Sequence, residues 1–397
     1  MTPAPAPTRA TPRGTPAPAP AAGASGSRPA RAPGRAGTAF RWAGAFALLG
    51  AAFVTDTVTG SEVSSSLYYV IAVAATAWLL GRGPGLAMAV LGAAAWLAAY
   101  RLSGQRFSHP AILLWNVGAE VTIYAAMALA LGFLREHVGE VRALAARLAE
   151  SHRLLDREMR VVGELQRQLL PPAPPQIPGY TWSVQYETST RAGGDYYDFV
   201  TLPDGRVGVL IADASGHGAP AAVLMAMTRT LLHAVAAGSP TPAGVLARLN
   251  CDLARLLPAG WFVTACCAFL DPRSGELVYS LAGHDPPYAL RADGRAPERL
   301  AACGGPLLGP FPGAEYDTLA ARLAPGDALV LYTDGLPEAA DPDGRLLERE
   351  AVEAVLESVP DLRPVTIRAH VVEHVRRHRA GAAPSDDLTL LILGREA

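Results

Sequence analysis

Long apolar stretches separated by short polar links fill much of the first third of the chain. They cover roughly 39–58, 64–81, 84–100 and 111–134. A helix that crosses a hydrocarbon core of about 30 Å needs about 20 apolar residues. The pattern therefore predicts an all-α membrane domain over 39–134 with about four transmembrane spans. The first and fourth stretches fit best, because Ser64–Ser66 dilute the second and the third is short.

Arginines flank this region unevenly. Six of them precede or begin the first stretch: Arg9, Arg13, Arg28, Arg31, Arg35 and Arg41. Because positive charge stays on the cytoplasmic side, the N-terminus is predicted inside the cell, and four spans return the chain to the cytoplasm. Arg135, Arg142 and Arg147 follow the last span and agree, whereas Arg101 and Arg106 fall in a loop predicted outside. The protein is thus expected in the cell membrane.

Two polar residues, Asn116 and Glu120, lie within the fourth stretch. Ionisable groups inside a membrane are costly and usually face the interior of a helix bundle. They indicate either a sensing site or a structural polar contact between spans.

The first 38 residues are mainly Pro, Ala, Arg, Gly and Ser, with no apolar period. Such a segment buries too little surface to order itself, which predicts a disordered tail over 1–38. A signal peptide is the alternative, but the charged part before the apolar run is unusually long for one.

Residues 135–170 show a helical pattern with apolar residues every seven positions, at Val141, Leu148, Leu155, Val162 and Leu169. Leu144 and Leu165 occupy a second seam, which Ser151 and Glu158 interrupt. The pattern predicts a short parallel coiled coil and hence a homodimer. The alternative is a single amphipathic helix that lies on the next domain. Four prolines between 171 and 175 end the helix.

Strand-like and helix-like patterns alternate over the remaining domain, 171–397. Period-two or continuous apolar runs predict strands over 181–188, 195–201, 206–213, 261–270, 276–282, 327–333 and 388–393. Helical periodicity predicts helices over 219–236, 241–257, 347–358 and 365–378. The fold class expected here is mixed α/β (α+β).

Composition narrows the function. The formal net charge of −2 gives no basic field for nucleic acid. The four cysteines, Cys251, Cys266, Cys267 and Cys303, have no metal-binding spacing and begin no Cys-x5-Arg loop. A cysteine-based phosphatase is therefore not expected, and core thiols are the simpler interpretation.

Aspartates stand at the ends of four predicted strands beside glycines. Asp195 begins a strand and Asp213 ends the next, with Asp204-Gly205 between them as a hairpin turn. A two-residue turn there would place Asp195 opposite Ala214, one step from Asp213. Facing Cβ atoms lie about 5 Å apart, so two anions there are unfavourable without a cation between them.

A second acidic pair follows the same pattern. Asp334 ends one apolar strand, and Asp386-Asp387 begin the last. If these strands are antiparallel neighbours, the carboxylates cluster as well. Oxygen-only groups suit hard cations such as Mg²⁺ or Mn²⁺, and two such ions can hold a phosphoryl group between them. Each aspartate taken alone is more simply a turn residue or a helix cap.

Glycines surround these acids. Gly193 and Gly194 would let the backbone approach closely, Gly216 and Gly218 permit a tight turn before a helix, and Gly335 turns the chain after Asp334. His217, between two of these glycines, lies either near bound phosphate or merely at the helix start.

Four segments, "RAGGDYYDF", "ADASGHGAPAA", "YTDGLPEA" and "SDDLTL", resemble in this order the SpoIIE-type phosphatases of the metal-dependent serine/threonine (PPM-type) family. Two longer segments, "ELQRQLLPPAPPQIPGY" and "FVTACCAFLDPRSGELVYSLAGHDPPY", resemble the family's first segment and central hairpin. The resemblance covers about 163–394 and implies an αββα sandwich, two antiparallel sheets flanked by helices.

The resemblance also implies two Mn²⁺ or Mg²⁺ ions and the residues that hold them. Asp195 and Asp213 are expected at the dinuclear centre, with the Ala214 carbonyl as a further ligand. Asp334 and Asp386 are expected on one metal, and Asp386 is favoured over Asp387 by its place in the motif. No counterpart is assigned for the arginine that binds phosphate in eukaryotic relatives, although Arg191 is nearby.

The reaction implied is hydrolysis of a phosphoserine or phosphothreonine protein, often an anti-anti-sigma factor of the STAS type, by a metal-activated water. Two other functions stay open. "GGDYY" is similar to the GGDEF signature of diguanylate cyclases, although that fold does not explain the other three acids. A membrane-anchored pseudophosphatase that only binds a partner is the second alternative.

Overall fold

The computed structural model describes residues 35–59, 66–104, 108–302 and 305–397. The chain divides into two compact units, Met1–Arg147 and Leu148–Ala397. The tail predicted over 1–38 and Cys303 lie outside the described residues, except that Arg35–Thr38 belong to the first helix.

The first unit is helical. Each of the four apolar stretches lies in a helix: α1 (Arg35–Thr59), α2 (Ser66–Leu80), α3 (Arg82–Leu102) and α4 (Pro110–Leu169). Its core consists of Tyr69, Met88 and Tyr124 among alanines. These small residues let the helices approach closely, as at Gly85, where an added Cβ would lie 2.7 Å from the Cβ of Ala77.

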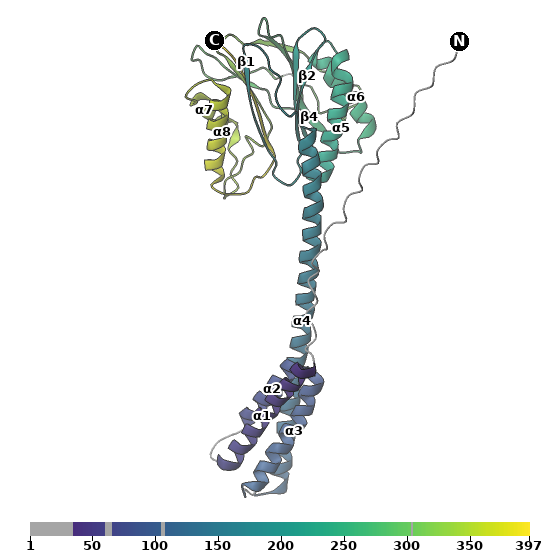
Figure 1. Cartoon of the computed structure of the whole chain (residues 1–397), viewed down its shortest axis with the longest axis vertical. Coiled ribbons are helices and arrows are strands. Elements are labelled where there is room, and N and C mark those ends of the chain that lie inside the picture. Colours follow the sequence, from purple (N-terminus) through teal and green to yellow (C-terminus); the bar gives the residue numbers. More distant parts are fainter. Residues whose placement is uncertain (1–34, 60–65, 105–107, 303–304) are drawn as a thin grey trace, which may run out of the picture. The chain divides into compact units, whose positions relative to one another are not determined.

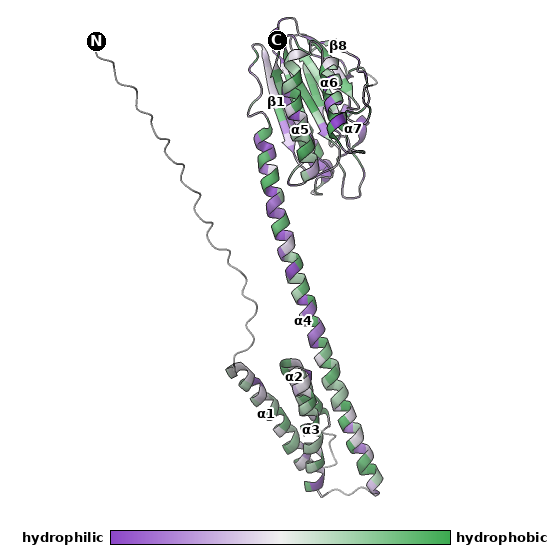
Figure 2. Ribbon diagram, turned by 90° about the vertical axis from the view of Figure 1, so that its right-hand side faces the viewer, coloured by the Kyte–Doolittle hydropathy of each residue, from purple (hydrophilic) through white to green (hydrophobic). Residues whose placement is uncertain are grey.

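Four helices among the described residues are long and apolar enough to cross a membrane: Ala36–Thr59, Arg82–Leu102, Pro110–Leu169 and Ala219–Gly238. The predicted second span, α2, is a shorter apolar helix of 15 residues. The last candidate lies in the second unit, where it packs Leu224, Met225 and Leu232 into a sheet core. Figure 2 shows green apolar residues along α1 to α3 and the first part of α4.

Helix α4 continues without a break from the last apolar stretch into the predicted linker. It is 60 residues long and ends at Leu169, close to the predicted end of the linker. Purple and green residues alternate along its second part in Figure 2. Only its residues from Leu148 onward belong to the second unit.

The second unit contains two five-stranded sheets. In spatial order, the first sheet consists of β1 (Tyr180–Glu187), β10 (Leu388–Arg395), β9 (Ala328–Tyr332), β6 (Tyr288–Leu290) and β7 (Glu298–Arg299). The second consists of β2 (Asp195–Thr201), β3 (Val207–Ala214), β4 (Val263–Leu270), β5 (Glu276–Ala282) and β8 (Leu319–Arg322). All pairings between these strands are antiparallel.

Helices cover the outer face of each sheet (Figure 1). On the side of β2 and β4 lie α5 (Ala219–Val235), the short 3-10 helix η2 (Ala236–Gly238) and α6 (Pro242–Leu256), and on the other side lie α7 (Glu348–Glu357) and α8 (Pro364–Arg379). Three apolar layers result, one between the sheets and one under each helix pair. Strand β3 contributes Ile211 to the middle layer and Leu210 to the outer one, as strand alternation requires. This four-layer αββα sandwich confirms the predicted fold class.

The β2–β3 hairpin corrects one prediction. Asp195 pairs with Asp213 and not with Ala214. The connection has three residues, Pro203–Gly205, because Leu202 and Arg206 still pair across it. Gly205 has a φ of 87°, the left-handed conformation that closes such a three-residue turn. The extra residue shifts the register by one and brings the two carboxylates directly opposite each other.

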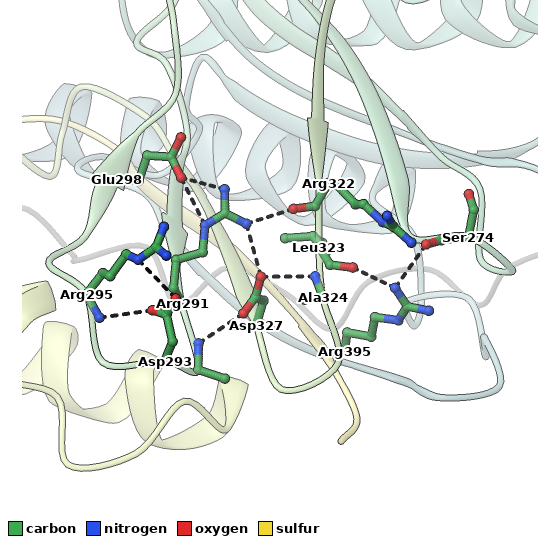
Figure 3. A network of polar contacts seen from close by, with 11 residues as sticks. Ser274, Arg291, Asp293, Arg295, Glu298, Arg322, Leu323, Ala324, Asp327 and Arg395 are labelled. Atoms are coloured by element: carbon green, nitrogen blue, oxygen red, sulfur yellow. Dashed lines mark hydrogen bonds and ion pairs between the residues drawn. The ribbon is translucent and has the colours of Figure 1, made fainter.

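An arginine-rich network ties the sheets together at one end of the strands (Figure 3). Arg291 donates to Glu298, to the carbonyl oxygen of Arg322 and to Asp327, while Arg395 donates to the carbonyl oxygens of Ser274 and Leu323. Because β9 runs from Asp327 towards Asp334, this network lies at the opposite end of the strands from the predicted acidic cluster.

Candidate metal centre

The four predicted acids come from both sheets and meet at one end of the sandwich. Asp195 and Asp213 face each other across β2 and β3. Asp334 follows β9 and Asp386 precedes β10, and these two strands are antiparallel neighbours. The charge of Asp213 interacts with those of the other three acids.

Asp195 is the most buried member, with 1% of its surface exposed. Its Oδ2 accepts hydrogen bonds from Thr333 Oγ1 at 2.8 Å and from Thr389 Oγ1 at 2.6 Å. Its Oδ1 is buried and has no hydrogen-bond partner. Burial holds the pKa of this carboxyl well above its usual range. An unpaired buried carboxylate oxygen is costly, and a cation beside it removes that cost.

Burial and neighbouring carboxylates also raise the pKa values of Asp213 and Asp334. Burial, followed by the nearby charge of Asp195, raises the pKa of Asp213 to about 9. Burial and the charge of Asp386 raise the pKa of Asp334 to about 6. Like charges that share a poorly solvated site favour the protonated form. The ionised cluster is therefore unfavourable until a positive charge enters it.

Asp386 and Asp387 differ in their contacts. Asp387 has 3% of its surface exposed, and its two oxygens accept hydrogen bonds from the backbone N–H groups of Ser189 and Gly194, at 2.7 Å each. Asp386 is half-buried and only its Oδ1 accepts, from the N–H of Asp387. Both oxygens of Asp387 are therefore occupied by backbone N–H groups, including that of Gly194. Asp386 is the more available of the two carboxylates for a metal.

The paired glycines lie where no side chain fits. A Cβ on Gly193 would clash with the carboxylate of Asp387. A Cβ on Gly194 would clash with the Ala214 carbonyl oxygen and would lie 2.9 Å from Asp213 Oδ1. These two oxygens thus lie on the same side of the loop, next to each other. Gly335 is equally restricted, since a Cβ there would clash with the backbone of Asp387.

The turn after β3 leads directly into α5. Gly216 and Gly218 have φ values of 88° and 74°, which side chains other than glycine rarely adopt. His217 between them is exposed, and its charge interacts with that of Asp386. The structure therefore places His217 beside the acidic cluster and at the start of the helix at once.

Several residues at the site were missed by the sequence analysis. Thr333 and Thr389 orient Asp195, and a signal existed, because each stands one to three residues from a predicted acid. Gln166 of α4 is the third residue that was missed, and only 3% of its surface is exposed. It donates to the Gly193 carbonyl oxygen at 2.7 Å and accepts from the Gly193 N–H at 3.0 Å. Nothing in the sequence distinguishes Gln166 from its exposed helical neighbours.

The side chain of Arg191, two residues before Gly193, forms an ion pair with α4. Its Nε donates to Asp156 of α4 at 2.8 Å, and its side chain is 54% exposed. On the same helix, a Cβ at Gly163 would clash with the carbonyl oxygen of Arg191. The end of α4 therefore packs directly on the backbone that leads to Asp195.

The donors fit a hard cation. Four carboxylates and the Ala214 carbonyl offer only oxygen, the ligand that Mg²⁺ and Mn²⁺ prefer. Within the described ranges, no group of three or more His, Cys, Asp or Glu side chains is arranged so that it could hold a metal ion. The carboxylates converge but do not close around a point, so water and the backbone carbonyl would have to complete any coordination sphere.

Comparison with known proteins agrees with this geometry. Residues 203–396 match the model of the family described as "Stage II sporulation protein E (SpoIIE)". Over residues 203–396, the second unit is therefore similar to the SpoIIE family. The match includes Asp213, Asp334 and Asp386, and begins after Asp195.

Two curated relatives are similar over the same region. The phosphoserine phosphatase RsbU of Bacillus subtilis is 28% identical over half of this chain and 59% of its own length. The protein IcfG of Synechocystis sp. is 25% identical over 58% of this chain and 40% of its own length. The chain thus spans about half the length of these relatives.

Two solved structures share the fold. The RsbU and RsbW domains of Rv1364c from Mycobacterium tuberculosis align with a TM-score of 0.51 at 30% identity, over 58% of this chain and 64% of that one. The SiaA-PP2C domain of Pseudomonas aeruginosa aligns with a TM-score of 0.54 at 23% identity, over 62% of this chain and 98% of that one. Both support the sandwich architecture.

Proposed function

We propose that this chain is a membrane-anchored, metal-dependent protein phosphatase that hydrolyses phosphoserine or phosphothreonine in a partner protein. The observation that carries the proposal is Asp195, which is buried, keeps one oxygen without a hydrogen-bond partner and pairs with Asp213 across the hairpin. A carboxylate cluster of this kind in a SpoIIE-family domain is suited to metal-assisted hydrolysis.

The residues have distinct roles in this proposal. Asp195, Asp213, Asp334, Asp386 and the Ala214 carbonyl would hold two Mn²⁺ or Mg²⁺ ions, which supply an activated water and neutralise the phosphate oxygens. Thr333 and Thr389 fix one oxygen of Asp195 by hydrogen bonds, and Asp387 accepts a hydrogen bond from the N–H of Gly194.

No covalent intermediate on the protein is required. Cys266 and Cys267 are buried in strand β4, and Cys251 is exposed on α6, away from the strand ends that carry the acids. Direct attack of water on phosphorus is therefore the reaction that these residues support.

We propose a STAS-type anti-anti-sigma factor as the phosphorylated partner. The support is the family resemblance together with the similarity to RsbU, which is named a phosphoserine phosphatase. The arginines before α1 and after residue 134 support a cytoplasmic phosphatase domain attached to a multi-pass membrane region.

Dimerisation through α4 is part of the proposal. Five of the predicted seam residues leave more than half of their surface exposed: Val141, Leu144, Leu148, Leu155 and Leu165. A second copy in a parallel coiled coil would cover them. Because Gln166 on the same helix binds Gly193, the geometry of the dimer would reach the loop before Asp195 and so control metal occupancy.

The catalytic proposal is tested with Asp213→Asn. We expect hydrolysis of p-nitrophenyl phosphate in Mn²⁺ to fall by about a thousandfold or more, since one of the carboxylates that would hold the ions is lost. Wild-type rates in the purified variant would refute the metal assignment. Mn²⁺ binding by the wild type without turnover of any phosphoprotein would favour the pseudophosphatase, and turnover of GTP would favour the cyclase.

The regulatory proposal needs a separate comparison. The full chain and a variant that lacks residues 135–170 should differ in specific activity and in Mn²⁺ affinity. Gln166→Ala, in the full chain, should lower Mn²⁺ affinity as well, whereas Gln168→Ala on the exposed side of the same turn should not. Equal affinities in all four proteins would contradict control through α4.

A further inference from the structure

The first unit, Met1–Arg147, contains a group of oxygen-bearing side chains that the proposed catalytic function does not use. They come from three helices: Asp56 from α1, Ser66 and Tyr69 from α2, and Glu120 and Tyr124 from α4. Asp56 lies close to the last residue of α1, and Ser66 is the first residue of α2. The group therefore lies towards the end of the bundle where α1 finishes and α2 begins.

Direct contacts join these side chains. The Ser66 hydroxyl donates to Glu120 Oε1 at 2.5 Å, and the Tyr69 hydroxyl donates to Asp56 Oδ2 at 3.3 Å. The rings of Tyr69 and Tyr124 lie 6.3 Å apart. The Tyr124 hydroxyl lies within hydrogen-bonding reach of Glu120 and interacts electrostatically with Asp56. The two carboxylates and the two phenols therefore face a common region between the helices.

This region lacks a positive partner. The ion pairs that the structure shows in the described part of the unit join Arg82 to Glu136 and His137 to Glu140, and neither involves Asp56 or Glu120. The Oε2 atom of Glu120 and the hydroxyl of Tyr124 are buried and have no hydrogen-bond partner beyond their contact with each other, and Tyr124 is completely buried. Unpartnered polar atoms at this depth are costly and indicate a missing ligand.

We propose that these five residues bind a divalent cation of the Ca²⁺ type. Two carboxylates balance a double positive charge, and hydroxyl and carboxylate oxygens are the donors that hard cations prefer. Asn116 precedes Glu120 by one helical turn and provides a further amide oxygen on that face of α4. The group contains no His or Cys, the ligands that favour zinc or copper.

Binding there would tie α1, α2 and α4 together at one point. Glu120 and Gln166 belong to the same continuous helix, so the membrane unit would gain a cation-dependent means of acting on α4. This last step rests on the proposed regulation of the phosphatase, whereas the binding site itself does not.

Terbium luminescence tests the site directly, because Tb³⁺ replaces Ca²⁺ and is excited through nearby tyrosines. The full chain in lipid nanodiscs carries Asp213→Asn and Asp334→Asn, which weaken metal binding at the catalytic centre. We expect saturable Tb³⁺ emission that Ca²⁺ displaces. Glu120→Gln or Asp56→Asn should weaken binding by about ten- to a hundredfold, the effect of losing one charged contact.

Two further variants serve as controls. Tyr124→Phe keeps the ring and removes the hydroxyl, so binding should weaken several-fold with little change in folding. Glu136→Gln removes a carboxylate of the same helix that pairs with Arg82 instead, and it should leave binding unchanged. If Glu120→Gln fails to fold, Glu120→Asp, which keeps the charge on a shorter side chain, should still weaken binding.

Two results would overturn the proposal. Emission with the same affinity in Glu120→Gln, Asp56→Asn and the parent protein would place the ion elsewhere. Absence of saturable binding in the folded parent would show that these residues hold no cation. Because the parent is already deficient in catalysis, neither result depends on whether the chain is a phosphatase.

Discussion

Asp195 and Asp327 lie at opposite ends of the same sandwich, and both are almost fully buried, with 1% and 4% of their surface exposed. Asp327 accepts from Arg291 at 3.0 Å and from the backbone N–H groups of Ala292 and Ala324, so both of its oxygens are satisfied. Asp195 has two hydroxyl donors on one oxygen and none on the other, and it faces another acid.

The difference separates a buried carboxylate that the chain pairs internally from one that it leaves with an unpartnered oxygen. A buried carboxylate is tolerated when it is paired and hydrogen-bonded, as in the network of Figure 3. At the other end of the sandwich, no described residue supplies a hydrogen bond or a positive charge to Asp195 Oδ1. We therefore expect substitutions at the two ends to affect different properties of the protein.

The largest effect should separate the two aspartates by activity. Asp195→Asn should lower phosphatase activity in Mn²⁺ by about a thousandfold, a loss of about 4 kcal/mol in transition-state stabilisation. Asp327→Asn should leave the activity per folded molecule within about twofold. The measurement is initial rates on a phosphopeptide, corrected for the folded fraction by circular dichroism. Similar losses in both variants would remove the distinction.

The free energy of unfolding should depend strongly on Asp327, the residue whose replacement barely changes activity. Asp327→Ala leaves Arg291 without its buried partner and should lower the free energy of unfolding by about 3 kcal/mol. Urea unfolding of residues 148–397, followed by tryptophan fluorescence, measures it. Asp293→Ala, which removes an exposed ion pair with Arg295 in the same region, is the matched control and should cost less than about 1 kcal/mol. An equal cost for both would contradict the proposed role of Asp327.

The pH dependence of the metal-free protein should reveal the unpaired charges. The pKa of Asp213 is raised to about 9 in the folded state, so the folded state holds a proton that the unfolded state releases near pH 4. Its contribution to stability is present below about pH 4 and is lost as pH rises through about 9. Asp213→Asn cannot ionise, so at pH 8 it should be more stable than the wild type by several kcal/mol, since about 1.4 kcal/mol is lost by the wild type for each pH unit above about 4.

Thermal unfolding in a chelator at pH 4 and pH 8 provides the measurement. The advantage of Asp213→Asn should shrink towards pH 4 and should vanish or reverse when Mn²⁺ is added, because the metal stabilises only the wild type. A variant that is less stable than the wild type at pH 8 without metal would show that the carboxylate is satisfied by other means.

The smallest expected effect concerns the orientation of Asp195. Thr389→Val removes one of the two hydroxyls that bind Oδ2 and should lower activity about fivefold, the result of losing about 1 kcal/mol of hydrogen bonding. Thr389→Ser keeps the hydroxyl and should restore most of the activity. Rescue by Ser distinguishes positioning through the hydroxyl from loss of packing, and its failure would argue for packing.

Local patterns in the sequence predicted most of the fold. The seven expected strands and four expected helices of the sandwich occur within a few residues of their predicted bounds. The short strands β6, β7 and β8 were missed, since β7 has only two residues and β8 alternates weakly. Hydrophobic period and turn residues are properties of neighbouring positions, so they can be read without the tertiary structure.

The sequence by itself also determined which acids stand at strand ends, because a strand that ends in Asp-Gly is visible in the chain. Only the tertiary structure decided that Asp195 faces Asp213, that Asp387 holds Gly194, and that Gln166 binds Gly193. These facts depend on one extra residue in a turn and on contacts between segments far apart in the chain. Register and long-range hydrogen bonds are set by how the whole domain packs, and no local pattern records them.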